Sequence, residues 1–400
     1  MDESLNAQTA IHSPGSDPAD RIVLVLRKQG VLSRAEIARR TGMARSTVSE
    51  TVRELIDQGL IVEGQVQRTG RHGRPAVGIS LNPRAGTWIG LDFGQQNVLG
   101  IIVDVSHTIL AASEVALGSD YGPDAGLDAA VKIVGDLLTA SGTGFERVVG
   151  VAAAVPGPVD PQSGRILGTR RTPRWTGVEL ARDLQLRLGC TVLVENDSNC
   201  AALAEHAWGV GRAYRDLVVL KLDSGVGGGV IVGDELVRGV GGLAGEFGHM
   251  TVEPGGPVCP CGGRGCLEAL VGIRAILEQM RSVKGDVTFG EFVELVASGD
   301  RAARRVILEA ADRIGRAIAN ILITTGPEVV VLSGAMTQVG EPFLGAVRES
   351  FERYSITGRQ GLATPAHVLI GTLGRHACAL GAVVLLMSGL GLDDRRRPIG

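Results

Sequence analysis

The most informative stretch of the sequence is GEFGHMTVEPGGPVCPCGGRGCLE, residues 245–268. It places His249 ten residues ahead of the first of three close-set cysteines, Cys259, Cys261 and Cys266. One imidazole and three thiolates are the ligand set of a tetrahedral structural zinc site. The glycines and prolines between them permit the tight turns of a metal knuckle. The stretch therefore predicts a zinc knot, and three unmetallated cysteines are the alternative.

Two carboxylates, Glu246 and Glu268, stand at the two ends of the same stretch. A metal site that holds both ends of a loop also fixes the side chains at those ends. We therefore expect the knot to support part of a small-molecule pocket.

Length and charge indicate more than one domain. Four hundred residues suggest two or three domains with sizeable cores. The formal net charge is only -3, but residues 19–84 hold twelve Lys or Arg against six Asp or Glu, a net of +6, so the remainder carries -9. A basic segment on an acidic body predicts a polyanionic partner for that segment alone.

Cysteine content and hydropathy predict a soluble cytoplasmic protein. Six cysteines in a chain of this length do not form a disulfide scaffold, and three of them lie within eight positions. Met1–Asp20 has no apolar core, so no signal peptide is expected. The longest apolar candidate, Ala377–Leu392, is too short to span a membrane. Thiols kept reduced in the cytoplasm are available to a metal ion.

The segment after residue 19 has the pattern of a helix-turn-helix. A first helix ends at Gly30, and Ser33-Arg34-Ala35-Glu36 then forms a capping box that starts a second. The turn Thr41-Gly42 leads to a third helix over about Arg45–Gln58. A short helix, a glycine turn and a helix with a polar outer face are typical of DNA-binding domains, and an ordinary three-helix bundle is the alternative. The expected DNA contacts on the third helix are Arg45, Ser46, Thr47, Ser49 and Arg53.

Two expected strands, at 60–62 and 77–81, make this a winged helix-turn-helix. Between them lies the basic segment RTGRHGRP, residues 68–75. A flat, extended and cationic segment suits the narrow minor groove of A·T-rich DNA, where it would insert Arg71 and Arg74. A wing that touches only phosphates is the alternative.

The order of elements after residue 87 predicts the fold of the body. Three strands, a helix, a strand, a helix and a strand follow one another between Trp88 and Val194. A dinucleotide-binding fold would need a parallel βαβ unit with a spaced glycine fingerprint. The observed order is typical of the actin-like, ribonuclease H-like fold. A second strand, glycine turn and strand over 217–229 begin a second lobe.

In combination these motifs resemble the ROK family (repressors, open reading frames, kinases). The similarity covers about Asp20–Leu390. It rests on the winged head and on PGPVD at 156–160, ENDSNCAALAE at 195–205, GVGGG at 225–229, GEFGH at 245–249 and CPCGGRGCLE at 259–268. The resemblance implies an α/β protein in which a winged helix-turn-helix precedes a two-lobed, sugar-binding, actin-like body with a structural zinc ion.

The expected domain boundaries follow from this resemblance and from the pattern of elements. They are a disordered tail (1–18), the winged helix-turn-helix (19–82), a linker (83–86), a first lobe (87–200), a second lobe with the zinc knot (201–372), a C-terminal helix that returns to the first lobe (373–392) and a second tail (393–400).

The resemblance also implies a set of sugar-binding residues. Asp197 matches the aspartate that acts as general base in the kinases of the family, and a helix cap is the alternative for that residue alone. Carboxylates and amides suit a polyhydroxylated ligand because each can bond two hydroxyls. The implied sugar-binding residues are Gly157, Asn196, Asp197, Glu246, His249 and Glu268.

The phosphate-handling turns depart from the family pattern. Family kinases resemble Asp-x-Gly-Gly-Thr in the first turn, where this chain has Asp92-Phe93-Gly94-Gln95-Gln96. In the second turn Asp223 brings a carboxylate toward the place of a polyphosphate, and repulsion between like charges opposes binding there. We therefore expect little or no phosphorylation by ATP, with Asp197 kept for sugar binding.

Two functions follow as hypotheses. The first is a sugar-responsive transcriptional regulator, in particular a repressor, whose homodimer or tetramer binds double-stranded operator DNA and whose zinc-supported cleft binds a sugar or sugar phosphate. The alternative is an ATP-dependent sugar kinase with an attached DNA-binding head. A scaffold stapled by zinc is a third interpretation. The arginines within 169–175 are unusual for the family, and they either admit a phosphorylated or acidic sugar or face water.

Overall fold

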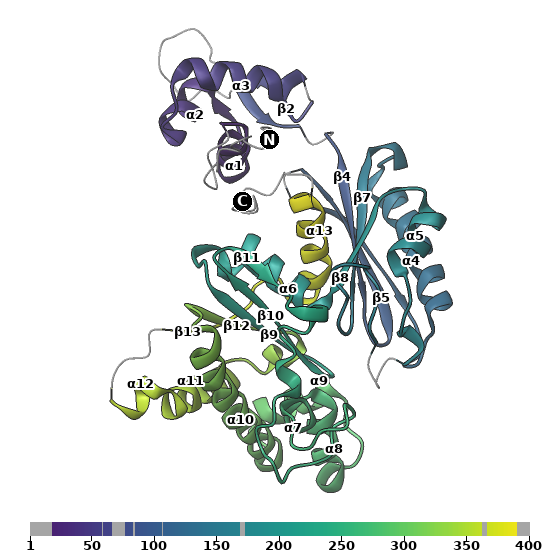
Figure 1. Cartoon of the computed structure of the whole chain (residues 1–400), viewed down its shortest axis with the longest axis vertical. Coiled ribbons are helices and arrows are strands. Elements are labelled where there is room, and N and C mark those ends of the chain that lie inside the picture. The colour runs from purple at the N-terminus through teal and green to yellow at the C-terminus, as the bar shows by residue number, and fades with distance from the viewer. Residues whose placement is uncertain are drawn as a thin grey trace, which may run out of the picture.

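The structure is a computed structural model that describes residues 18–57, 59–65, 77–82, 85–105, 107–168, 173–361 and 366–389. A small head is joined to a body of two lobes, and each lobe contains one five-stranded sheet (Figure 1). This confirms the predicted fold class. Several expected segments lie outside the described residues: residues 1–17 of the first tail, the second tail, residues 83–84 of the linker, and the wing segment with Arg71 and Arg74. Pro18, placed in the expected first tail, begins helix α1.

The head consists of three helices and a three-stranded antiparallel sheet in the order β1-β3-β2. The capping box is confirmed, because the Ser33 side chain accepts from the Glu36 amide while the Glu36 side chain accepts from the Ser33 amide. A strand of two residues, β1, was not predicted because it is too short to show alternation. The elements are α1 (Pro18–Gln29), β1 (Leu32–Ser33), α2 (Arg34–Thr41), α3 (Arg45–Asp57), β2 (Ile61–Gln65) and β3 (Val77–Leu81).

The first lobe contains a mixed sheet in the order β6-β5-β4-β7-β8. Strands β4, β5 and β6 pair antiparallel, whereas β4, β7 and β8 pair parallel. Helices α4 and α5 cover one face of this sheet (Figure 1). The elements are β4 (Thr87–Phe93), β5 (Asn97–Asp104), β6 (Ile109–Ala116), α4 (Pro123–Ser141), β7 (Val148–Val155), α5 (Leu180–Leu188) and β8 (Val192–Asn196).

The second lobe repeats this topology, with the order β11-β10-β9-β12-β13 and the same division into antiparallel and parallel pairs. Two similar lobes in one chain are the actin-like arrangement that the sequence predicts. The strands are β9 (Leu217–Leu222), β10 (Val226–Val232), β11 (Glu235–Val237), β12 (Val329–Ser333) and β13 (His367–Ile370). The outer helices are α7 (Leu267–Val271), α8 (Ile273–Lys284), α9 (Phe289–Ala297), α10 (Arg301–Thr325), α11 (Glu341–Tyr354) and α12 (Ile356–Arg359).

Two helices, α6 (Asp197–Ala207) and α13 (Ala377–Gly389), lie between the two sheets (Figure 1). Helix α6 packs on β9 and β10, and α13 packs on α6, β4 and β7. A side chain at Gly381 would lie 1.7 Å from the Cys200 carbonyl oxygen, so only glycine lets the two helices approach this closely. The expected lobe boundary at 200/201 therefore falls inside α6, a helix that both lobes share.

The sequence of α13 is apolar on every side because the helix is enclosed on every side. Among the described residues, none of the helices combines the length and the apolarity needed to cross a membrane.

Candidate functional site

The four predicted metal ligands lie together. The ligand atoms of His249, Cys259, Cys261 and Cys266 are all within 4.8 Å of one another. The distance from Cys261 Sγ to Cys266 Sγ is 3.7 Å, as is that from Cys259 Sγ to His249 Nδ1. In a tetrahedron with Zn–S bonds of about 2.3 Å, neighbouring sulfurs are about 3.8 Å apart. The residues present therefore fit a tetrahedral metal ion.

Electrostatics at these cysteines also favours a cation. Burial, the neighbouring thiols Cys261 and Cys259, and the charges that these carry raise the pKa of Cys266 to about 12. Burial likewise raises the pKa of Cys259. Burial raises the pKa of Cys261, but hydrogen bonds from the Gly263 amide and the neighbouring thiols lower it below its ordinary value. A metal ion among the three cysteines would favour the thiolate form of each.

Tight turns hold the four predicted ligands together, as the glycines and prolines predict. The Cys259 amide donates to the Gly263 carbonyl at 2.8 Å, and Thr251 bridges to Cys266. A side chain at Gly265, where φ is +67°, would lie 1.6 Å from the Glu253 carbonyl oxygen. Glycine is therefore required where the loop returns to its start.

His249 connects the metal cluster to the predicted sugar site. It ends the short 3₁₀ helix η5 (Phe247–His249), and its Nδ1 faces Cys259. Its Nε2 lies 3.8 Å from Glu246 Oε2. A metal-binding histidine commonly directs its other ring nitrogen toward a carboxylate, which fixes both side chains. In this arrangement His249 would bind the metal and orient Glu246 at the same time.

Three of the predicted sugar-binding residues bring carboxylates to one place. Burial, together with the neighbouring charges of Asp197 and Glu268, raises the pKa of Glu246 to about 7. Glu268 is held by the Val226 amide, which donates to its Oε2 at 3.0 Å. The side chains of Asp197 and Glu246 remain 16% and 28% exposed, which leaves them accessible to a ligand.

Asn196 is the N-cap of α6, so the cap is not Asp197. Its Oδ1 accepts from the amides of Ser198 and Asn199 at 2.9 and 3.0 Å. Its Nδ2 donates to the Gly157 carbonyl at 3.0 Å, which joins the PGPVD loop to the start of α6. Asp197 is the first residue of the helix. Its carboxylate is therefore left for other partners.

Lys221 is the polar residue that the sequence analysis missed. Its Nζ lies 2.8 Å from Asp197 Oδ2 and 3.2 Å from Asp223 Oδ2, and the side chain is 19% exposed. Burial lowers the pKa of Lys221, but Asp197 and Asp223 are among the groups that raise it, and the pKa is well above its ordinary value. One signal was available, because Lys221 is the single charge in the strand LVVLKL.

Two further carboxylates complete this group. Asp223 Oδ1 accepts from the Ala335 amide at 2.7 Å, so the side chain is fixed between Lys221 and the turn after β12. Burial and the charges of Asp197 and Asp223 raise the pKa of Asp92, Lys221 lowers it, and the resulting pKa is about 7. We call Lys221 together with these carboxylates the interlobe cluster, which comprises Lys221, Asp92, Asp197, Asp223, Glu246 and Glu268.

The glycine run at 225–229 has a packing role in addition to the predicted turn. A side chain at Gly227 would lie 2.2 Å from Ser198 Oγ, and one at Gly229 would lie 2.5 Å from Ala202 Cβ. These glycines lie in β10 and allow α6 to rest directly on the strand. The run therefore sets the separation between α6, which carries Asp197, and the sheet that carries Lys221.

The predicted DNA-contacting face of α3 is open to solvent. Arg45, Ser46 and Arg53 are exposed, and Thr47 and Ser49 are half-buried. Neither Arg45 nor Arg53 forms an ion pair or a side-chain hydrogen bond within the described part of the chain. The opposite face supplies the core through Val48, Val52 and Leu55. The helix therefore presents unpaired cations to the outside.

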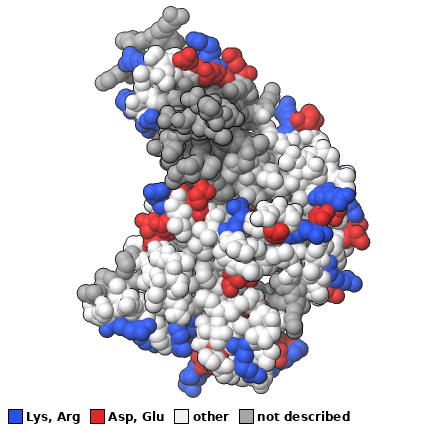
Figure 2. Space-filling model, viewed as in Figure 1, with Lys and Arg blue, Asp and Glu red and all other residues white. Residues whose placement is uncertain are grey.

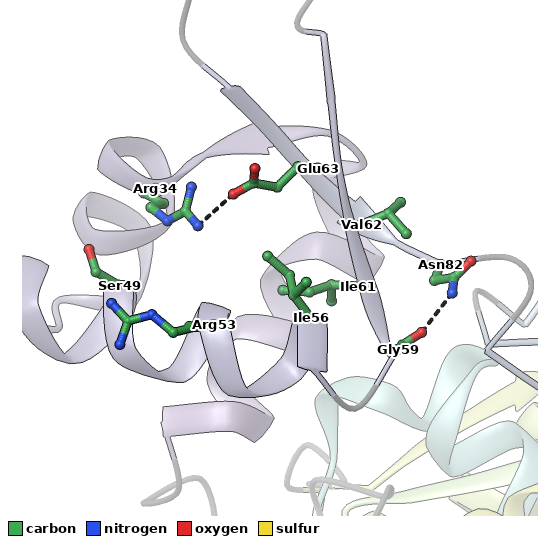
Figure 3. Close-up of a pocket in the computed structure, with 9 residues that line it drawn as sticks. All are labelled: Arg34, Ser49, Arg53, Ile56, Gly59, Ile61, Val62, Glu63 and Asn82. Atoms are coloured by element: carbon green, nitrogen blue, oxygen red, sulfur yellow. Dashed lines mark hydrogen bonds and ion pairs between the residues drawn. The ribbon is translucent and has the colours of Figure 1, made fainter.

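A cavity of about 630 Å³ lies beside this face, between α3 and β2 (Figure 3). Ser49 and Arg53 of α3 form one side, and Val62 and Glu63 of β2 form the other. Arg34, which sequence analysis did not select, donates to Glu63 Oε1 at 2.6 Å and so ties the start of α2 to the wing strand.

The described side chains of the head account for only part of the positive charge that the sequence predicts there. Basic and acidic side chains both appear on the head in Figure 2, and the outer surface of the body is similarly mixed on the face shown. The residues that contribute most of the expected excess, including the wing arginines, lie outside the described side chains.

Within 169–175, residues 169–172 also lie outside the described part. The described arginine, Arg174, donates to the Asp120 carbonyl at 3.0 Å, and Trp175 is buried against Phe93. Arg174 is therefore engaged on the first lobe.

Comparison with known proteins gives consistent matches over both parts. The ROK family profile matches residues 88–388, and a winged helix-turn-helix DNA-binding profile matches residues 17–62. The xylose repressor of Bacillus spizizenii is 29% identical over 355 residues, which cover 88% of this chain and 90% of the repressor.

Two solved structures extend the comparison. A ROK family transcriptional regulator, a homologue of the E. coli MLC protein, superposes with a TM-score of 0.75 at 23% identity and covers 94% of this chain and 96% of its own. A Streptomyces griseus glucokinase in complex with glucose and AMPPNP has a TM-score of 0.68 at 29% identity and covers 75% and 99%. The regulator shares the fold over nearly the whole chain.

Proposed function

Because the chain belongs to the ROK family, we propose that it is a sugar-responsive transcriptional repressor that binds operator DNA. The observation that carries the proposal is the combination, in one chain, of a helix with unpaired exposed arginines and a body with an accessible cluster of carboxylates. The similarity to a xylose repressor over both parts supports it. A DNA target would place the protein in the cytoplasm.

The proposed DNA contacts are those predicted from the sequence. Arg45, Ser46, Thr47, Ser49 and Arg53 would enter the major groove from α3. Arg71 and Arg74 would contact the minor groove or phosphates from the wing. A homodimer or tetramer would present paired heads to a pseudo-palindromic operator.

The proposed sugar site comprises Gly157, Asn196, Asp197, Glu246, His249 and Glu268. Carboxylate oxygens accept hydrogen bonds from sugar hydroxyls, and Asn196 would hold the Gly157 loop beside them. A sugar that binds one arrangement of the lobes better than another by about 1–3 kcal/mol would change operator affinity about 5–150-fold.

We assign Zn²⁺ to His249, Cys259, Cys261 and Cys266 as a structural ion. When bound, it would neutralise the thiolates and hold the loop between Glu246 and Glu268. Four protein ligands leave no open coordination position, so this ion would have no direct contact with the sugar.

The alternative function is an ATP-dependent sugar kinase, which the similarity to the glucokinase favours. The position of Lys221 argues against it, because its ammonium group, 2.8 Å from Asp197 Oδ2, occupies the carboxylate that a general base would use to accept a proton. Asp223 adds a fixed carboxylate where a polyphosphate would lie. We therefore propose a degenerate kinase body that no longer transfers phosphate.

An experiment on the full-length protein separates these functions. Operator fragments are selected from genomic DNA, and their binding is measured by mobility shift with and without a panel of sugars. We expect one sugar to weaken operator binding, with no sustained ADP release from ATP and that sugar. Turnover that is lost in Asp197→Asn would favour the kinase, and operator binding that is insensitive to every sugar would contradict the sugar response.

A further inference from the structure

The interlobe cluster contains more negative than positive charge. Asp197, Asp223 and Glu268 stand against one ammonium group, that of Lys221, and Asp92 and Glu246 add two more carboxylates. These groups come from both lobes, because Asp92 lies in β4, one residue before its end, whereas Lys221 lies in β9. A ligand at the cluster would therefore face carboxylates on both sides.

The positive charge of Lys221 is already used. Its contact with Asp197, at 2.8 Å, has the distance of a charged hydrogen bond, and Asp223 Oδ2 lies 3.2 Å away as an ion-pair partner. Asp223 is fixed by the Ala335 amide, so it cannot swing away without losing that bond. A phosphate group would have to displace one of these partners and would leave a carboxylate with its charge unpaired.

Two other described arginines of the body are also engaged. Arg238 lies 2.6 Å from Glu195 Oε2, and Arg174 donates to the Asp120 carbonyl. The imidazole of His249 faces Cys259 on one side and Glu246 on the other. Hydroxyl groups need no cation, since they donate to carboxylates and accept from the ammonium that remains.

We propose that the interlobe cluster binds an uncharged sugar and excludes the phosphate ester of that sugar. This proposal rests on the sugar-binding function proposed above. Lys221 and Asp223 set this specificity. Lys221 neutralises Asp197 without offering a free positive charge, and Asp223 holds Lys221 in that position.

The test measures binding of matched pairs of ligands to the full-length, zinc-loaded protein by calorimetry. The probes are xylose, glucose and N-acetylglucosamine, the phosphate esters of these sugars, and inorganic phosphate, each with and without magnesium. We expect at least one free sugar to bind and its ester to bind at least about tenfold more weakly, with no binding of inorganic phosphate. An ester that binds as tightly as its free sugar would overturn the proposal. It would do so even if replacing Arg170 and Arg171 by alanine removed that binding.

Asp223→Asn provides the gain-of-function arm. The asparagine oxygen can still accept from the Ala335 amide, but one negative charge beside Lys221 is removed. We expect the ester to bind this variant at least about fivefold more tightly than the wild type, with free-sugar affinity changed less. The matched control is Asp286→Asn, which removes the same charge from an exposed side chain on the second lobe. An equal gain in both variants, or no gain in Asp223→Asn, would count against a role for Asp223.

Failure of this proposal differs from failure of the proposed function. If esters rather than free sugars release the operator, the specificity proposed here is wrong and the sugar-responsive repressor stands. If no sugar of either kind binds while operator binding is intact, both are wrong.

Discussion

The charged side chains of helix α3 and those of the interlobe cluster are arranged in opposite ways. On α3, Arg45 and Arg53 are exposed and have no ion-pair partner within the described residues. In the interlobe cluster, Lys221 contacts two carboxylates and is largely buried. Unpaired surface cations suit a polyanion that arrives from outside, whereas a paired internal cation leaves hydrogen-bonding groups for a neutral ligand.

This difference shows that the pairing of charges predicts a ligand better than their number. The described side chains of the head are mixed in sign, yet α3 keeps its arginines free. The body carries the excess of acid, yet its one cluster lysine is unavailable to an anion. The predictions below test each side of the comparison.

The largest effect is expected at the four proposed zinc ligands. Their loop should stabilise the interlobe cluster, whereas α3 should not depend on it. Cys266→Ser removes a buried ligand, so we expect loss of bound zinc and a fall of at least about 4 kcal/mol in the free energy of unfolding. Sugar binding should be lost before operator binding. Zinc content and thermal unfolding measure this, with Cys190→Ser, outside the cluster, as control. Full zinc content and unchanged stability in Cys266→Ser would contradict the assigned ligand set.

The next effect tests the free arginines of α3. Replacing Arg45 and Arg53 together by alanine should lower operator affinity about 30-fold or more, because each contact contributes about 1–3 kcal/mol. The salt slope should also fall by about 0.9 for each arginine that contacts a phosphate. Fluorescence anisotropy at several salt concentrations measures both. The control replaces Arg182 and Arg281, two exposed arginines of the body that have ion-pair partners. An equal loss in the control would mean that total charge, and not α3, governs binding.

The third effect tests the carboxylate side of the comparison. Asp197→Asn should weaken binding of the effector sugar about 10–100-fold, because a hydrogen bond to a charged group contributes about 1.5–3 kcal/mol. Operator binding without sugar should stay unchanged. Calorimetry and mobility shift measure the two properties, with Asp128→Asn on the exposed surface of α4 as control. Unchanged sugar affinity would remove Asp197 from the proposed site.

How much of this site was predictable depends on sequence separation. The metal ligands are close in the chain, so their spacing alone predicts their cluster. The contact between Lys221 and Asp197 joins residues 24 positions apart, and it depends on α6 resting against β10. The Asp223 contact with Ala335 spans 112 positions. Neither contact is marked by a local motif. The sequence therefore predicts that the Asp223 carboxylate opposes a polyphosphate, but it does not predict that Asp223 also holds Lys221.

The fold shows the same limit. Strand periodicity and the capping box predict most elements, and the doubled strand–turn–strand theme predicts two lobes. The burial of α13 between the lobes depends on Gly90 and Gly381, at which a side chain would meet backbone atoms of Ala379 and Cys200. Such tertiary contacts of glycine leave no trace in periodicity. The return of the C-terminal helix to the first lobe was predicted from the family resemblance and not from periodicity.

The smallest expected effect concerns Asp92 and the charge state of the interlobe cluster. Burial and the charges of Asp197 and Asp223 raise its pKa and Lys221 lowers it, so that the pKa shifts from 3.8 to about 7. A carboxyl with a raised pKa stabilises the fold below pH 3.8, and that contribution is lost as the pH rises through about 7. Relative to wild type, Asp92→Asn should therefore gain stability between about pH 5 and pH 8, on the order of 1 kcal/mol.

Urea unfolding at both pH values measures this difference, and Asp128→Asn, whose carboxylate is exposed, should show none. The opposite sign, with Asp92→Asn relatively less stable at the higher pH, would mean that Asp92 is charged in the folded protein and is a third partner of Lys221. Lys221 would be held by three carboxylates, and an anionic ligand would have to compete with all of them for the one cation of the cluster.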